Sequence, residues 1–171
     1  MQAAFKVFRA TSADVRAITE LTQRSPAAAH WTEEQYSAAI QAADEPFDRV
    51  MLVAREVSDQ ETSPVLGFVV ARHLPPEWEL ENIVVSPASQ RQGIGRRLLR
   101  SLLERALETT SEAIFLEVRA SNRAAQSLYE SVGFCQTGRR RLYYSNPSED
   151  AILYRLTLGD SGLREGTTHR G

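Results

Sequence analysis

The most constraining feature of the sequence is an apolar strand that leads through a glycine-containing turn into an amphipathic helix and a second strand. The first strand is predicted over 78–85 (WELENIVV) and the second over 113–120 (AIFLEVRA). Between them, apolar residues recur at helical spacing from Ile94 to Leu107, which predicts a helix over about 94–109. A helix that links two strands in this way makes them parallel through a right-handed crossover.

The other elements are expected to surround this unit. The expected helices span 11–24, 30–43 and 121–134, and the expected strands span 50–57, 65–74 and 151–158. Because the early strands carry no crossover helices, the pattern predicts an α+β fold with a mixed, mostly antiparallel sheet and flanking helices. Residues 1–158 are expected to form a single domain, and the polar segment 159–171 is expected to be a disordered tail.

Composition excludes several classes of protein. The 171 residues carry a net charge of −2, from 22 acidic and 20 basic residues, so no direct nucleic-acid binding is expected. No apolar run approaches the roughly 20 residues of a membrane span, and the N-terminus lacks the apolar segment of a secretory signal, so a cytoplasmic protein is expected. With three scattered histidines and one cysteine, no metal site is expected. Cys135 is expected to be a small buried apolar residue.

The turn SPASQRQGIG suggests an anion site. A helix N-terminus presents unpaired N–H groups and partial positive charge, and glycines let a ligand approach the backbone. Arginines at 91, 96 and 97 add charge around Gly93 and Gly95. The Walker pattern fails, because Arg96-Arg97 follow the glycine, and the dinucleotide fingerprint fails, because Leu98 occupies its third glycine position. The alternative is a tight turn whose glycines bind nothing.

A fuller pattern resembles the GNAT acetyltransferases. Residues 90–95 (QRQGIG) match the Q/R-x-x-G-x-G/A signature of that family, and LEVRASNRAAQSLYESVGF over 116–134 and RRLYYSNPSEDAI over 140–152 resemble its RimI-type branch. The resemblance implies acetyl-CoA as cofactor, with its pyrophosphate on the turn, and as acceptor the N-terminal α-amine of a protein such as a ribosomal protein. Cofactor binding is then implied for Ile83, Val84, Val85, Arg91, Gln92, Gly93, Ile94, Gly95, Arg96 and Asn122.

Glu117 and Tyr129 are the candidate catalytic residues. Alternation in the strand puts Glu117 on the opposite face from its apolar neighbours, either in a salt bridge with Arg119, at an exposed edge, or as a partly buried general base. The resemblance implies the base. Tyr129 could pack in the core, whereas the resemblance implies a proton donor to the leaving thiolate. Asn122 could cap its helix as well as bind the pantetheine arm.

Five further residues are candidates for the acceptor site. Alternation places Glu79 and Glu81 on the same face as Ile83, and either acid is a rival or assisting base. Tyr143 and Tyr144 could line a peptide groove or form a cross-strand pair, and Trp31 could cover the acceptor entrance or pack in the core. The neighbouring run Arg139-Arg140-Arg141 is interpreted as a solvated basic face.

The sequence therefore predicts an acetyl-CoA-dependent N-acetyltransferase that transfers acetyl directly to a protein N-terminal α-amine in a ternary complex. Two alternatives stay open. One is acetylation of a lysine side chain or a small amine by the same fold. The other is a non-catalytic acyl-CoA-binding module that kept the turn.

Overall fold

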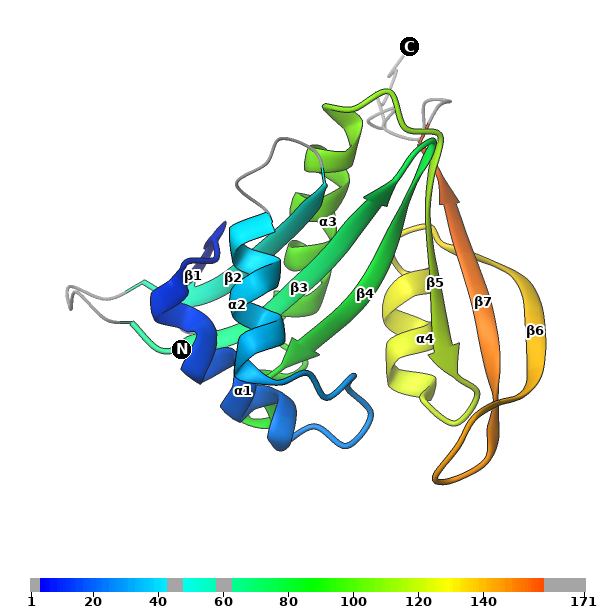
Figure 1. Ribbon diagram of the computed structural model, residues 1–171, viewed down its shortest axis with the longest axis horizontal. Helices are drawn as coiled ribbons and strands as arrows, with labels where there is room; N and C mark the ends of the chain where they lie inside the picture. The colour runs from blue at the N-terminus through cyan, green and yellow to red at the C-terminus, as the bar shows by residue number, and fades with distance from the viewer. Residues whose placement is uncertain (1–3, 43–47, 58–62, 159–171) are drawn as a thin grey trace, which may run out of the picture.

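A single seven-stranded sheet organises the chain in the computed structural model, which describes residues 4–42, 48–57 and 63–158 (Figure 1). The strand order is β1-β2-β3-β4-β5-β7-β6. The strands are β1 Phe5–Arg9, β2 Arg49–Glu56, β3 Val65–Leu74, β4 Glu77–Val85, β5 Ala113–Arg119, β6 Cys135–Tyr144 and β7 Glu149–Thr157. The α-helices are α1 Val15–Gln23, α2 Glu33–Ala42, α3 Ile94–Leu107 and α4 Arg123–Glu130.

The predicted parallel unit is confirmed. β4 pairs with β5 in parallel and α3 connects them, while the other recorded strand pairs are antiparallel. The pairing between β4 and β5 ends at Glu79 and Phe115. Beyond that point the two strands diverge toward the end of β4 (Figure 1). The sheet is therefore the mixed, mostly antiparallel one that the sequence predicts.

Two apolar clusters lie on opposite faces of the sheet. One contains α3 residues such as Leu98 and Leu102, together with Tyr129 of α4 and side chains of β2 to β5 and β7. The other joins α1 and α2 to β2, β3 and β4 through residues such as Ile18 and Phe68. Helices α1 and α2 therefore cover one face only over the first half of the sheet. In the described chain, the same face of β5, β7 and β6 carries no helix, and we call it the open face (Figure 1).

The sequence analysis did not predict strands β1 and β6, and it predicted the burial of Cys135 wrongly. β1 is short and interrupted by Lys6 and Arg9, and β6 is mostly exposed, so neither shows the apolar alternation that reveals a half-buried strand. The prediction that Cys135 is buried was wrong, because the residue begins the exposed edge strand β6. The predicted tail 159–171 lies outside the described residues.

A capping box forms the start of α2. The Thr32 N–H donates to Gln35 Oε1 at 2.8 Å, and the Gln35 N–H donates to Thr32 Oγ1 at 3.2 Å. Just before this start, the Trp31 ring packs against Tyr36 at a tilt of 36°, with ring centroids 5.3 Å apart.

Candidate active site

A β-bulge in β4 decides which of its side chains reach the open face. The register between β3 and β4 shifts so that Val70 pairs with Asn82 and Ala71 with Leu80, leaving Glu81 as the extra residue. Asn82 points toward α2, because its Nδ2 donates to the Ala29 carbonyl at 2.9 Å. The prediction that Ile83 shares a face with Glu79 and Glu81 was wrong, since the bulge reverses the alternation. Ile83 packs into the cluster beneath α3.

Glu81 is held by a bidentate ion pair. Arg49 donates from Nε to Glu81 Oε2 at 2.9 Å and from Nη2 to Oε1 at 2.8 Å. The Arg49 guanidinium also lies over the Trp31 ring, 5.7 Å from its centroid. Both carboxylate oxygens of Glu81 therefore have a cationic partner, and Trp31 is connected to Glu81 through Arg49.

Glu79 has a different environment from Glu81. Its pKa is raised by burial and by the neighbouring charges of Glu81 and Glu117, against the opposing effect of Arg72 and Arg49. Of the two acids that the sequence singled out on this strand, Glu79 has a raised pKa and lies close enough to Glu117 for that charge to contribute.

Glu117 lies on the open face in the middle of β5, as predicted. Its strand neighbours Leu116 and Val118 are buried on the opposite face, and its own side chain is 20% exposed. The predicted alternative partner, Arg119, instead pairs with Glu149 at 3.1 Å. Glu117 Oε1 meets Arg140 Nη1 at 2.9 Å.

The two consecutive tyrosines of β6 both approach Glu117. The pKa of Tyr143 is raised mainly by a hydrogen bond with the Glu117 carboxylate, and burial is the second cause. Burial and the negative charge of Glu117 raise the pKa of Tyr144 to about 12. Their rings meet edge to face with centroids 5.1 Å apart, and Arg119 lies over Tyr144 at 4.3 Å.

Tyr129 approaches from the α4 side. Its side chain is 5% exposed and packs against Phe134 and Tyr154. Burial raises the pKa of Tyr129, and the nearby Tyr144 adds to that rise. The phenol is therefore kept protonated. The core-packing interpretation holds for the ring, and the hydroxyl remains a candidate proton donor.

The glycine turn forms the N-terminus of α3. Gly93 is the N-cap residue with φ of 83°, a conformation that favours glycine, and no side chain caps the helix there. A side chain at Gly93 would have open space around it, whereas one at Gly95 would come within 2.9 Å of Leu128 Cδ2. Gly93 thus leaves the helix terminus open for an anion, while Gly95 allows α3 to pack closely on α4.

The end of β4 lies beside this turn. A Cβ at Gly95 would lie 3.7 Å from a methyl group of Val85. Since the recorded pairing with β5 stops at Glu79, the backbone of Ile83, Val84 and Val85 has a recorded strand partner only in β3. The Val85 carbonyl accepts a long hydrogen bond of 3.4 Å from Gln90 Nε2. This stretch could pair with an extended ligand that contains amides.

Asn122 is the N-cap residue of α4. Its Oδ1 accepts a hydrogen bond from the Ala125 N–H at 3.1 Å. The capping alternative is therefore confirmed. A role toward the pantetheine arm would use its remaining amide group.

Sequence reasoning missed Arg49 and Arg140. Arg49 begins β2 before an apolar run, and no pattern links it to Glu81, which lies 32 positions away. Arg140 was interpreted as part of a solvated basic face, yet its guanidinium contacts Glu117. The adjoining tyrosines were the one available signal, because a basic residue beside a predicted acceptor groove can reach into it.

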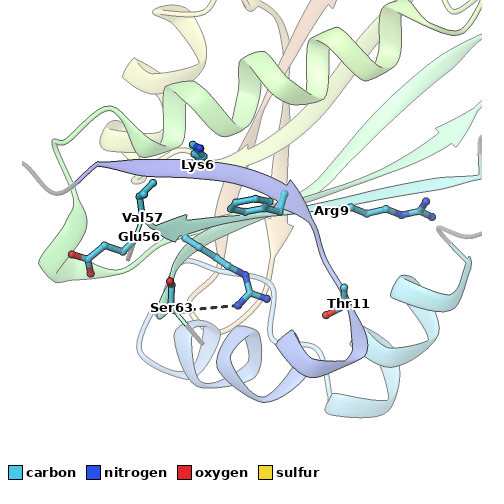
Figure 2. Close-up of a pocket in the computed structure, with 8 residues that line it drawn as sticks. Lys6, Arg9, Thr11, Glu56, Val57 and Ser63 are labelled. Atoms are coloured by element: carbon cyan, nitrogen blue, oxygen red, sulfur yellow. Dashed lines mark hydrogen bonds between the residues drawn. The ribbon is translucent and has the colours of Figure 1, made fainter. Parts of the chain in front are cut away.

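A hollow of the surface lies far from this site along the sheet, at the β1–β2 edge (Figure 2). Arg55 lines it and donates to the Ser63 carbonyl at 3.4 Å. Its lining contains none of the predicted site residues.

In the part of the chain that the structure describes, no helix is long and apolar enough to cross a membrane, and no group of three or more His, Cys, Asp or Glu residues could hold a metal ion.

The fold and the turn place the chain in a known family. The model of the acetyltransferase (GNAT) family matches residues 15–134, which is more than half of the chain, so the protein belongs to this family. The match runs from α1 through the glycine turn to the end of the α4 segment. It thus includes Glu117 and Tyr129 but not the two tyrosines of β6.

Particular relatives point to one branch. N-alpha-acetyltransferase RimI of Mycobacterium tuberculosis is 47% identical over 91 residues, which cover 53% of this chain and 56% of that relative. The chain thus spans little more than half the length of this curated relative. The crystal structure of the ribosomal-protein-S18-alanine N-acetyltransferase from Escherichia coli is similar with a TM-score of 0.74 and 30% identity, over 95% of this chain and 99% of that one. The yncA protein of Salmonella typhimurium, solved with acetyl-CoA, has a TM-score of 0.77 at 22% identity over 95% of this chain and 99% of its own, which supports the fold.

Proposed function

We propose that the protein transfers an acetyl group from acetyl-CoA to the N-terminal α-amine of a protein, with a ribosomal protein as the acceptor class. The observation that carries the proposal is the position of Glu117. It is a partly buried carboxylate on the open face, beside the point where β4 and β5 separate. The family match and the α-amine acetyltransferases among the relatives support it. A cytoplasmic location, where ribosomal proteins are made, is part of the same proposal.

Acetyl-CoA would extend along the free edge of β4. The pyrophosphate would bind the N-terminus of α3, with Arg91, Gln92, Gly93, Ile94, Gly95 and Arg96 around it. The pantetheine amides would pair with the backbone of Ile83, Val84 and Val85, and the Asn122 amide group would contact the arm. This arrangement directs the thioester into the gap between β4 and β5, toward Glu117.

The chemistry needs one base and one acid. An α-amine has an ordinary pKa near 8, so at neutral pH it must lose a proton before it attacks the thioester carbonyl. Glu117 would accept that proton, and backbone N–H groups at the end of β4 would stabilise the oxyanion. When the C–S bond breaks, Tyr129 would donate its proton to the departing thiolate. Burial keeps Tyr129 protonated for that role.

Glu79 is the second candidate base. Its pKa is raised and it lies near Glu117, so it could take up a proton from the amine directly or pass on one received by Glu117. Glu81 is less suited to proton transfer, because Arg49 engages both of its oxygens. We therefore assign Glu81 and Trp31 to the wall of the acceptor site, together with Tyr143 and Tyr144.

A peptide panel tests the choice of acceptor. The protein is incubated with acetyl-CoA and three peptides that share a sequence apart from one position: one with a free α-amine and no lysine, one blocked at its N-terminus with a single lysine, and one carrying neither amine. Mass spectrometry locates the acetyl group. The proposal expects modification of the free α-amine. Acetylation confined to lysine would support the alternative of a side-chain acetyltransferase, and binding of acetyl-CoA without transfer to any amine would support the non-catalytic module.

A further inference from the structure

Arg140 occupies the position that the acceptor amine would need. Its Nη1 lies 2.9 Å from Glu117 Oε1, and its guanidinium carbon lies 5.4 Å from the centroid of the Tyr143 ring. Tyr143 contributes a hydrogen bond to the same carboxylate. A cation and a phenol of β6 thus bind the carboxylate that the proposed reaction requires as its base.

An irregularity in β6 brings these groups to Glu117. Arg140 pairs with Ala151 and Tyr144 pairs with Glu149, so residues 141–143 of β6 lie opposite only Asp150 of β7. The Leu142 N–H donates to Asp150 Oδ1 at 2.8 Å and holds the bulged segment in place. The bulge changes the facing of the strand, so that both Arg140 and Tyr143 turn toward the open face.

Among the described residues, the contact with Arg140 is the one direct ion pair that Glu117 makes. From β4 it faces Glu79, and from β6 it faces Arg140, Tyr143 and Tyr144. Two nearby cations of the sheet have other partners, since Arg119 pairs with Glu149 and Arg49 pairs with Glu81, and the charge of Arg72 acts on Glu79. Without Arg140, Glu117 and Glu79 would face each other with no cation bound to Glu117.

We propose that Arg140 is a positioning residue that serves as a tethered counter-ion for Glu117 and gives way to the ammonium of the acceptor. It keeps the carboxylate oriented while the site is empty, and the acceptor then takes its place on Oε1. Its side chain is 55% exposed, so it can swing into solvent when displaced. This inference rests on the proposed function, because it takes Glu117 as the base toward an amine.

Arg140→Ala tests the inference, with Arg139→Ala as the matched control. Arg139 is the adjacent residue of the same type, but it pairs with Ile152 on the opposite face of β6 and binds Asp150. The proposal expects Arg140→Ala to lower the KM for the acceptor roughly two- to fivefold near pH 7, where the α-amine is mostly protonated, because a competing cation is gone. It also expects the acid limb of the kcat/KM profile to move up by about half to one pH unit, because protonation of Glu117 becomes easier. Arg140→Lys should retain the position of that limb.

A titration of the ligand-free protein separates this inference from the proposed function. With 13C-labelled glutamate, the side-chain resonance of Glu117 is assigned by its loss in Glu117→Gln and followed against pH. Its midpoint should rise in Arg140→Ala and stay unchanged in Arg139→Ala. If the wild type acetylates no amine, the proposed function is wrong, and this titration alone decides the role of Arg140. Unchanged midpoints in both variants, equal shifts in both, or a higher acceptor KM in Arg140→Ala would overturn the inference.

Discussion

Glu117 and Tyr129 lie on opposite faces of the sheet, and their surroundings suit the opposite proton-transfer roles that we propose for them. Glu117 lies on the open face with polar and charged partners, whereas Tyr129 lies in an apolar cluster beneath α4. A carboxylate that contacts solvent can take up a proton, and a buried phenol keeps its own. At the scale of single residues, the proposed division into base and acid corresponds to the face of the sheet that each side chain occupies.

Tyr129→Phe should lower kcat about tenfold or more and leave the free energy of unfolding within about 1 kcal/mol of the wild type. The substitution removes the hydroxyl but keeps the ring contacts with Phe134 and Tyr154. Steady-state kinetics and urea denaturation measure the two effects. Tyr154→Phe is the control: its hydroxyl donates to Glu130 Oε1 at 2.6 Å, so its loss should reduce stability by about 1 kcal/mol without reducing kcat. Full activity in Tyr129→Phe would remove Tyr129 from the mechanism.

At the scale of elements, the close approach of β3 to β4 determines the position of the strand edge that the cofactor is proposed to use. Gly67 of β3 pairs with Val85, and an added Cβ at Gly67 would lie 2.7 Å from the Val84 carbonyl oxygen and 3.2 Å from the Val85 Cα. Both are backbone atoms, which cannot move aside as a side chain can. Glycine at this position therefore determines where the end of β4 lies.

Gly67→Ala should lower the free energy of unfolding by about 1–3 kcal/mol and weaken acetyl-CoA binding, since relief of the clash must displace the end of β4. Chemical denaturation and isothermal titration calorimetry measure these effects. Gly138→Ala in β6 is the matched control, because an added Cβ there has no atom within 4 Å. Equal stability of the two variants would contradict the argument.

Elements with a buried apolar face could be predicted from the sequence, and those without one could not. The unit of β4, α3 and β5 was predicted because its apolar residues repeat at the spacing of a strand or a helix. The same alternation put Glu117 on the correct face. It misplaced Ile83, because a bulge adds one residue without any mark in the sequence. The exposed strand β6 was missed for lack of apolar periodicity, and with it the contact between Arg140 and Glu117.

At the scale of the whole molecule, helices cover the two faces of the sheet unequally. α3 and α4 pack on one face, and α1 and α2 cover only the first half of the other. The uncovered half carries Glu117 and the tyrosines of β6, while the N-terminus of α3 lies at the end of β4. In the proposed arrangement, an acceptor would approach from the open face while the cofactor would lie along the diverging strands. This geometry suits direct transfer between two substrates bound together.

Stability of the whole fold should fall as pH rises above about 10. Burial is the main cause that raises the pKa of Tyr144 and of Tyr154, each to about 12, from the ordinary value of 10.0. Between these values the unfolded chain releases phenolic protons that the folded protein retains, so stability is full below pH 10 and declines toward pH 12. Urea denaturation at successive pH values measures the decline, and tyrosinate absorbance locates the ionisation. Constant stability to pH 12 would contradict the burial of these phenols.

The central claim is that Glu117 is the base toward an amine acceptor beside bound acetyl-CoA. The most direct measurement is the turnover of Glu117→Gln with acetyl-CoA and the α-amine peptide, alongside Glu79→Gln and the affinity of each variant for acetyl-CoA. We expect Glu117→Gln to lower kcat by about 10²–10⁴ with nearly unchanged acetyl-CoA affinity, and Glu79→Gln to have a smaller effect. Retained turnover in Glu117→Gln, with a large loss in Glu79→Gln, would instead assign the base to β4.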